Sequence, residues 1–264
     1  MNAPRILLIY TGGTIGMLEN PVTGALEAFD WEHISNFVPE LERFHYDIDT
    51  VTFGPPIDSS DMEPKYWCRM VEIIAQNYEH YDGFVLLHGT DTMAFTASAL
   101  SFMLENLDKP VVVTGSQLPI GQLRTDGKEN LLTGTTKINS EGFNAFRSFN
   151  YPALAHAGIH IRFEEPYILR RPTAAAFRPS CQLDTHVAIL TLFPGIREEV
   201  VAAVANIPGL RGLVLKTYGA GNAPRKPWLY EQLMALCQRG VVIVNTSQCA
   251  TGAVDMGRYE TSLR

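Results

Sequence analysis

Residues 5–16 read Arg-Ile-Leu-Leu-Ile-Tyr-Thr-Gly-Gly-Thr-Ile-Gly, an apolar run that breaks into a turn of threonine and glycine. The branched apolar residues 6–9 are typical of a buried strand in a parallel sheet. The three glycines of the turn permit backbone conformations that other residues avoid, and they let a ligand approach the backbone N–H groups. The turn therefore places Thr14 at the carboxyl end of a strand, where open α/β sheets bind their ligands.

Two common phosphate-binding loops do not fit this turn. The dinucleotide fingerprint requires Gly-x-Gly-x-x-Gly, whereas the turn reads Gly-Gly-x-x-Gly, and the Gly-Lys-Ser/Thr of a P-loop is absent. Taken alone, the stretch also fits a tight turn that contains two threonines of no functional importance.

A second stretch repeats the pattern. Residues 83–93 read Gly-Phe-Val-Leu-Leu-His-Gly-Thr-Asp-Thr-Met, a short apolar strand that ends in a turn and continues into a helical pattern. Thr14 and Thr90 thus follow separate strands, and Asp91 supplies a carboxylate beside the second one. This arrangement suits a hydroxyl nucleophile that faces a group able to activate it. His88, a lone histidine at a strand end, is expected to be structural.

Composition excludes several classes of function. The 264 residues carry a formal net charge of −7 without a basic block, so nucleic acid is not expected as a partner. The four cysteines show no zinc-ligand spacing and are expected to be reduced thiols of a cytosolic protein. No apolar stretch is long enough to span a membrane, and the run at 6–9 is too short for a signal-peptide core.

Four motifs together resemble the cytoplasmic, type I L-asparaginases of bacteria, in residues, order and spacing. They are Thr-Gly-Gly-Thr-Ile-Gly at 11–16, Asp-Ser-Ser-Asp-Met at 58–62, His-Gly-Thr-Asp-Thr-Met at 88–93 and Thr-Gly-Ser-Gln-Leu-Pro at 114–119. The resemblance implies hydrolysis of L-asparagine to L-aspartate and ammonia in the cytoplasm, without a metal or an organic cofactor. It also implies a homodimer or homotetramer.

The resemblance assigns catalytic roles to Thr14, Thr90, Asp91 and Lys137. Thr14 would be the nucleophile, Thr90 and Lys137 would relay protons, and Asp91 would bind the α-ammonium of the substrate. By itself Lys137 reads as a solvated surface charge, and Asp91 as the N-cap of a helix. A lysine in a desolvated pocket, however, loses its proton readily enough to act as a base.

Further residues are expected to bind ligands. Ser59, and more weakly Ser60, would bind the substrate carboxylate, although Asp and Ser before Pro64 also fit simple helix capping. By resemblance, Asn222 would reach the active site of a neighbouring subunit. A possible allosteric asparagine site would include four residues of the second domain: Lys216, Ser247, Gln248 and Cys249. Lys216 stands where the family has arginine, and lysine lacks the bidentate fork that suits a carboxylate.

Alternating strand and helix patterns predict an α/β fold with two parallel sheets. The larger N-terminal domain, residues 1–165, is expected to be doubly wound, and a smaller parallel α/β domain follows at 186–264. Residues 166–185, rich in proline and arginine and without periodicity, are expected to be the linker.

The sequence departs from the family at two places. After Thr133 it continues directly at Gly134-Thr135-Thr136, where the family has a further helix and strand, a difference of about 25 residues, close to a βαβ unit in size. The chain also stops at Arg264, where the family continues through further helices. Two alternatives therefore stay open: a related amidase acting on glutamine or on a transfer-RNA-linked amide, and a degenerate amino-acid binding protein without activity.

Overall fold

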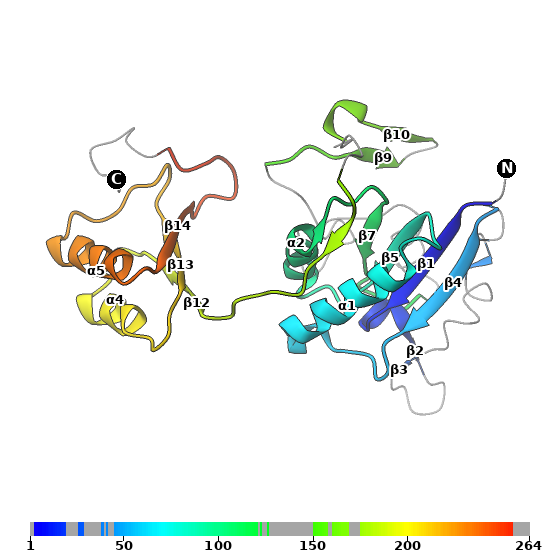
Figure 1. Cartoon of the computed structure of the whole chain (residues 1–264), viewed down its shortest axis with the longest axis horizontal. Helices are drawn as coiled ribbons and strands as arrows, with labels where there is room; N and C mark the ends of the chain where they lie inside the picture. Colours follow the sequence, from blue (N-terminus) through cyan, green and yellow to red (C-terminus); the bar gives the residue numbers. More distant parts are fainter. Residues whose placement is uncertain are drawn as a thin grey trace. The chain divides into compact units, whose positions relative to one another are not determined.

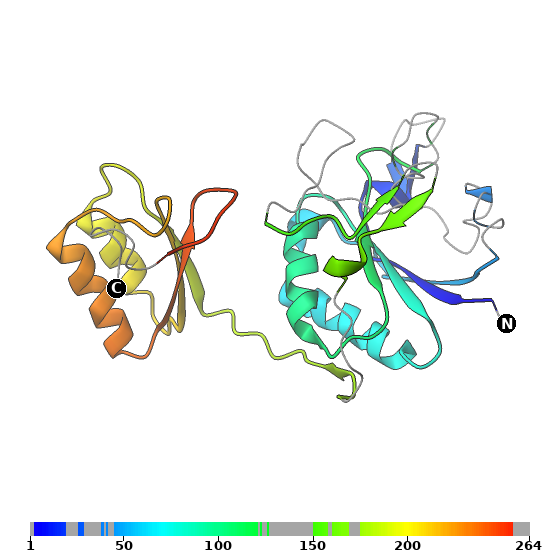
Figure 2. The same cartoon turned by 90° about the horizontal axis from the view of Figure 1, so that it is seen from above.

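The computed structural model describes residues 3–19, 26–28, 38–39, 41, 45–120, 122, 126, 150–157, 160–168 and 175–255. The chain divides into two compact units (Figures 1 and 2). Described residues from 3 to 126 and from 152 to 182 form the first unit, and residues 150–151 and 183–255 form the second.

The first unit is built on a parallel sheet in the order β4-β1-β5-β7. Its strands are β1 (Arg5–Tyr10), β4 (Asp47–Thr52), β5 (Gly83–Leu87) and β7 (Val111–Thr114). β1 is central because six successive residues pair with β4 on one side, while residues 6–10 pair with β5 on the other. Its apolar run is buried from Leu7 onward, as the sequence predicts for an interior parallel strand.

Two helices cover one face of this sheet: α1 (Pro64–Asn77) and α2 (Met93–Met103). Met70, Val71 and Ile74 of α1 lie at helical spacing and pack with Leu100 of α2 against the sheet. The opposite face packs Leu8 and Tyr10 of β1 with Leu87 of β5 and with residues outside the sheet, including Ile15 and Ile120. Among the described residues, loops and short elements rather than α-helices thus cover the second face.

Several short elements complete the first unit. They are η1 (Thr14–Gly16), β2 (Met17–Glu19), β3 (Leu26–Ala28), η4 (Ser59–Asp61), β6 (Leu104–Glu105), β9 (Ala155–Ala157), β10 (Ile161–Phe163), η5 (Glu165–Tyr167) and β11 (Arg178–Pro179). β2 pairs with β3, β9 with β10, and β6 with β11, each pair antiparallel.

The end of the first unit differs from the expected linker. Residues 175–182 lie within the segment predicted to connect the domains, yet they pack on the first unit. Arg178 and Pro179 pair with β6, and the ring of Phe177 stacks on that of Tyr78 with 3.9 Å between centroids. The N–H of Ser180 also donates to the carbonyl of Met103 at 2.8 Å, and the amide of Asn106 donates to the carbonyl of Ala176 at 3.1 Å. The sequence shows no periodicity here because only two residues form a strand and the other contacts are made one residue at a time.

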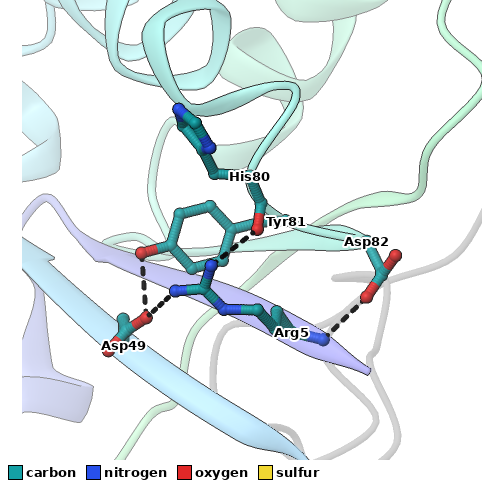
Figure 3. A network of polar contacts seen from close by, with 5 residues as sticks. All are labelled: Arg5, Asp49, His80, Tyr81 and Asp82. Atoms are coloured by element: carbon teal, nitrogen blue, oxygen red, sulfur yellow. Dashed lines mark hydrogen bonds and ion pairs between the residues drawn. The ribbon is translucent and has the colours of Figure 1, made fainter. Parts of the chain in front are cut away.

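Arg5 fixes the amino ends of three strands of the sheet (Figure 3). Its guanidinium donates to Asp49 at 3.0 Å and to the carbonyl of His80 at 3.2 Å, and its backbone N–H donates to Asp82 at 2.8 Å. Tyr81 donates to the same carboxylate oxygen of Asp49 at 2.9 Å, and the arginine lies over its ring. The network holds the register of the strands from the end opposite to the glycine turns.

β7 is the last strand on its side of the sheet among the described residues. Val112 of β7 is 41% exposed, and Phe95 and Phe102 of α2 are 65% and 80% exposed. Exposed apolar sheet surface is expected from the sequence if a helix and a strand are absent after Thr133, and that expectation stays a prediction because Thr133 lies outside the described residues.

The second unit has a three-stranded parallel sheet in the order β12-β13-β14. Its elements are β12 (Val187–Thr191), α4 (Glu198–Ala205), β13 (Gly212–Thr217), α5 (Pro227–Gln238) and β14 (Val242–Ser247). α4 and α5 lie side by side on one face, where Leu213 and Leu215 of β13 meet Leu229 and Leu233 of α5. This is the small α/β unit that the sequence predicts after residue 186.

Candidate functional site

The candidate site lies where the strand order of the first sheet reverses. The chain passes from β1 outward to β4 and then returns to the other side of β1 as β5, so the switch point lies between β1 and β5. Ligands of open α/β sheets bind outside the carboxyl ends of the strands at such a point. Thr14 follows β1, and Thr90 and Asp91 follow β5, so the sheet brings these residues to one place.

Hydrogen bonds connect the first turn to its neighbours on both sides. The backbone N–H and the hydroxyl of Thr11 both donate to the carbonyl of Leu87, at 3.0 and 2.9 Å. The carbonyl of Thr11 accepts from the N–H of Ile57 at 2.8 Å. Because Thr11 is buried, these bonds are shielded from water and fix the direction in which the chain leaves β1.

Two glycines of the first turn are required by close backbone approach. Gly13 has φ of +87°, and a Cβ atom built on it would lie 2.5 Å from the N and Cα atoms of Gly89. Gly12 has φ of +143°, and its Cβ atom would lie 2.0 Å from the carbonyl oxygen of Ile57. The turn after β1 is thus in backbone contact with the turns after β5 and β4, which no residue with a side chain permits.

Ser59 is held against the second turn. It is 5% exposed, and a Cβ atom on Gly89 would lie 2.5 Å from its Oγ. Its carbonyl accepts from the hydroxyl of Thr92 at 2.6 Å. Ser60, in contrast, is exposed and donates through both its N–H and its hydroxyl to Asp58, at 2.9 and 2.7 Å. Ser60 therefore takes part in capping, whereas Ser59 lies with the glycine turns, and the binding of a substrate carboxylate by Ser59 stays a prediction.

The bonds from Ser60 also affect Asp58. The backbone N–H of Ser60, and then its hydroxyl, stabilise the charged carboxylate, so the pKa of Asp58 lies below its ordinary value. Asp58 is therefore an ionised acceptor at neutral pH and caps the short helix η4 that contains Ser59.

The start of α2 differs from the prediction for Asp91. The N-cap residue is Thr92, and its side chain does not cap the helix but binds the carbonyl of Ser59. Asp91 lies one residue earlier and is exposed, whereas Thr90 is half-buried. The N-cap interpretation of Asp91 is therefore wrong, because the helix begins one residue later than the Asp-Thr pair suggests.

Tyr10 packs against the first turn and forms hydrogen bonds with it. Its ring would lie 2.3 Å from a Cβ atom on Gly16, and its hydroxyl lies 3.2 and 3.3 Å from the carbonyl oxygens of Gly13 and Gly16. Burial raises the pKa of Tyr10 to about 12, so the phenol keeps its proton and donates to these carbonyls at neutral pH.

His88 lies at the end of β5 and is completely buried. Its Nδ1 lies 2.6 Å from the carbonyl oxygen of Gly89, and its Nε2 lies 2.8 Å from the hydroxyl oxygen of Thr96 on α2. Thr96 in turn accepts from the indole N–H of Trp67 on α1 at 2.9 Å. Burial, as the largest cause, lowers the pKa of His88 below its ordinary value, so the ring is neutral. The structural role expected for this histidine agrees with these contacts.

The turn after β7 closes the site from the other side. The N–H of His88 donates to the carbonyl of Thr114 at 2.8 Å, and a Cβ atom on Gly115 would lie 2.2 Å from the carbonyl oxygen of His88 and 3.4 Å from Cγ2 of Thr90. The buried carboxylate of Asp126 accepts from the backbone N–H groups of Gln117 and Leu118, at 3.0 to 3.1 Å. Sequence reasoning missed Asp126, since its contact with this turn is tertiary.

Lys137 falls outside the residues that the structure describes. Its place relative to Thr14, Thr90 and Asp91 therefore stays a prediction.

The residues singled out in the second unit gather around one turn. Asn222 pairs through its backbone with Tyr218, and the hydroxyl of Ser247 donates to the carbonyl of Gly219 at 2.6 Å. The side-chain amide of Gln248 donates to the carbonyls of Leu192 and Lys216, at 2.7 and 2.9 Å. The bond from Ser247 joins the turn to the carboxyl end of β14, and the bonds from Gln248 join the segment after β14 to the carboxyl ends of β12 and β13. Cys249, the fourth residue of the predicted allosteric site, is exposed and donates its N–H to Ser247 at 3.0 Å.

Two properties of the described part of the chain concern metal binding and membrane spanning. No group of three or more His, Cys, Asp or Glu residues there is arranged to bind a metal ion. Within the same residues, none of the helices has both the length and the apolar character needed to cross a bilayer.

The fold and the site define a two-unit α/β protein whose threonine-bearing glycine turns meet at a sheet switch point. Comparison with known proteins identifies its family. The N-terminal asparaginase domain matches residues 5–136, and the glutaminase/asparaginase C-terminal domain matches residues 186–264. The chain belongs to the asparaginase family of amidohydrolases.

Individual relatives agree with this family. L-asparaginase 1 of Escherichia coli is 40% identical over 301 residues, which cover 99% of this chain and 84% of the relative. The crystal structure of L-asparaginase I from Vibrio cholerae matches with a TM-score of 0.86 and 37% identity, over 97% of this chain and 84% of that one. The L-asparaginase of Thermococcus kodakarensis is 32% identical over 98% of this chain and 85% of its own length.

The alignment with the Escherichia coli protein is longer than the chain itself, 301 residues against 264. The relative therefore has residues within the aligned span that have no counterpart here. The alignment length does not give their position, so the absence of a unit after Thr133 stays a prediction.

Proposed function

We propose that this protein hydrolyses the side-chain amide of L-asparagine to give L-aspartate and ammonia, with Thr14 as the nucleophile. The observation that supports this most strongly is the backbone contact between Gly13 and Gly89. Thr14 and Thr90 are the next residues along the chain, and successive Cα atoms are about 3.8 Å apart. The backbones that precede Thr14 and Thr90 are therefore in contact, and we infer that both hydroxyl groups can reach one small ligand.

The proposed reaction has two stages. The hydroxyl oxygen of Thr14 attacks the amide carbon, the C–N bond breaks, and the nitrogen takes up a proton and leaves as ammonia. A water molecule then adds to the carbonyl carbon of the resulting threonine ester. The bond to the Thr14 oxygen breaks, the hydroxyl regains a proton, and aspartate leaves. Backbone N–H groups of the glycine turns would stabilise the negative oxygen formed in each stage.

The other site residues are given supporting roles in this proposal. Thr90 and Lys137 relay the proton that leaves the hydroxyl of Thr14 and reaches the departing nitrogen. Asp91 binds the α-ammonium of the substrate, and Ser59 binds its α-carboxylate. Fixing both ends of the amino acid orients one amide for attack, which replaces a bimolecular encounter by a positioned one.

The decisive measurement is ammonia release from asparagine by Thr14→Ala and Thr14→Ser, with Thr191→Ala as the control at an exposed threonine. Loss in Thr14→Ala, partial activity in Thr14→Ser and full activity in Thr191→Ala are expected. Added hydroxylamine should divert product to the aspartyl hydroxamate, because it competes with water for the ester. Normal turnover by Thr14→Ala would refute the assignment of the nucleophile.

Lys137→Met tests the proton relay. Turnover should fall while the fold is retained, because the methionine keeps the length of the side chain but not the amine. Unchanged turnover would remove Lys137 from the mechanism.

Asparagine should be preferred over glutamine in the same assay. One extra methylene group in a fitted pocket costs about tenfold to two-hundredfold in kcat/KM. Faster turnover of glutamine would favour the related amidase instead, and binding of asparagine without ammonia release would favour a protein that only binds amino acids.

We further propose that the active form is a cytoplasmic homodimer or homotetramer in which Asn222 completes the site of a neighbouring subunit. Mixing inactive Thr14→Ala with inactive Asn222→Ala should then restore activity, because a mixed pair contains one site with both residues intact. Light scattering would give the number of subunits. A fully active monomer would refute this part of the proposal, and cell fractionation would test the compartment.

A further inference from the structure

His88 is a buried ionisable group that the proposed reaction does not use. Both of its ring nitrogens have partners, the carbonyl of Gly89 and the hydroxyl of Thr96, and the second of these also binds Trp67. His88 and Gly89 lie in the turn after β5, Thr96 lies in α2 and Trp67 lies in α1. The contacts therefore join the two helices behind the sheet to the turn that precedes Thr90.

The chemistry of the partner groups determines which atom donates in each of these three hydrogen bonds. A carbonyl oxygen only accepts, so Nδ1 of His88 carries the proton and donates to Gly89. In a neutral ring Nε2 then has no proton and accepts from the hydroxyl of Thr96. The indole N–H of Trp67 only donates, so it donates to the oxygen of Thr96. The bonds thus run from Trp67 through Thr96 and His88 to the carbonyl of Gly89.

The last acceptor lies in the peptide group that links Gly89 to Thr90. A peptide group is planar, so holding the carbonyl oxygen fixes the whole plane, including the N–H of Thr90 on the opposite side. Gly89 itself is packed between Gly13 and Ser59, because a Cβ atom on Gly13 would overlap Gly89 and a Cβ atom on Gly89 would overlap Ser59. The backbone of Gly89 therefore has little room to change its conformation. Rotation of this peptide would move Thr90 and, with it, Asp91.

We propose that His88 is a positioning residue for the reaction: its neutral ring, held by Thr96 and Trp67, sets the plane of the Gly89–Thr90 peptide and so aims the side chains of Thr90 and Asp91. The inference rests on the proposed function, because the roles of Thr90 and Asp91 come from it. His88 itself does not touch the substrate, and it transfers no proton in the reaction.

Two substitutions of His88 distinguish a positioning role from a role in core packing alone. In His88→Asn the side-chain amide reaches the position of Nδ1 and still donates to Gly89. In His88→Gln the amide extends towards Thr96, at the position of Nε2, and the bond to Gly89 is lost. Both replacements are polar and smaller than or similar to histidine, so a merely structural role predicts similar behaviour. The positioning role predicts different turnover.

The experiment measures kcat and KM for asparagine, together with the midpoint of thermal denaturation, for wild type, His88→Asn and His88→Gln. His88→Asn should keep kcat within about threefold of wild type, and His88→Gln should lose about tenfold, since small misplacement of a catalytic group has effects of this order or larger. KM should change less than kcat. Equal kcat values for the two variants, or losses that follow the denaturation midpoints, would overturn the inference.

Thr96→Val provides a variant that leaves His88 in place. It removes the hydroxyl that joins His88 to Trp67 while nearly conserving volume, so kcat should fall and the fluorescence of Trp67 should shift as its indole loses an acceptor. An unchanged kcat together with a shifted tryptophan fluorescence spectrum would show that the hydrogen bonds from Trp67 through Thr96 to His88 do not position Thr90. A wild-type protein that releases no ammonia from asparagine would refute the proposed function as well, whereas active wild type with equal histidine variants would refute this inference alone.

Discussion

Replacement of Gly13 by alanine tests the geometry on which the site depends. The new Cβ atom would lie 2.5 Å from both N and Cα of Gly89, whereas carbon atoms in contact prefer about 3.5 to 4.0 Å. Because the obstructing atoms are backbone, they cannot rotate away. The turns that precede Thr14 and Thr90 must therefore separate by about 1 Å, a displacement that can lower turnover about a hundredfold.

The backbone angle adds a second cost, and Gly195 offers a comparison at the same φ without the steric contact. Gly195 has the same φ of +87° as Gly13, but a Cβ atom there would meet nothing within 4 Å. Gly195→Ala should therefore cost only the left-handed strain, roughly 1–2 kcal/mol. Gly13→Ala should add an overpacking cost of typically about 1–3 kcal/mol. Gly13 also has ψ of 168°, which with this φ lies in a region that essentially only glycine adopts, so the difference between the two variants measures this backbone strain together with the contact between the turns.

Ammonia release from asparagine and urea denaturation of both variants provide the assay. Gly195→Ala should keep wild-type kcat/KM, and Gly13→Ala should lose about two orders of magnitude, equivalent to roughly 2.7 kcal/mol of transition-state stabilisation. If Gly13→Ala retained wild-type turnover, the contact between the two turns would not determine the position of Thr14, and the reasoning about the site would fail.

Three further predictions concern stability. Ile74→Ala, at a completely buried position of α1, should lower the free energy of unfolding by about 2–5 kcal/mol in urea denaturation, whereas Gln76→Ala on the exposed side of the helix should have little effect. Asp126→Asn should lower it by about 1–3 kcal/mol, because one oxygen that accepts backbone N–H groups becomes a donor; an unchanged denaturation midpoint would contradict this. The free energy of unfolding should fall as pH drops below the ordinary histidine pKa of about 6.5, because His88 takes up a proton in the unfolded state but stays neutral when buried. The dependence of this free energy on pH should approach about 1.4 kcal/mol per pH unit, and this contribution should be absent in His88→Asn.

Sequence reasoning identified the elements whose pattern is local. The apolar runs of β1 and β5, the helical spacing of Met70, Val71 and Ile74, and the alternating elements after residue 186 are each determined by the period of the residues themselves. The family motifs added the order of the turns. These features are predictable because a strand or an amphipathic helix needs only neighbouring residues to be recognised.

Features that depend on distant partners were beyond that reasoning. Phe177 packs on Tyr78 although it lies in a segment that reads as a linker, and Asp126 binds the turn at 117–118 across eight or nine residues. Asp91 reads as an N-cap, yet the helix starts after Thr92, whose hydroxyl binds Ser59 instead. In each case a contact from another element replaced the local preference.

The sequence by itself determined that glycine-rich turns carrying Thr14 and Thr90 would follow two buried strands. Only the tertiary structure decided that Gly13 and Gly89 touch, that Ser59 packs against Gly89, and that His88 joins two helices to the turn before Thr90. The physical reason is that strand order and close packing set these contacts. Neither is encoded by the period of any one segment, since both depend on which strands become neighbours in the sheet.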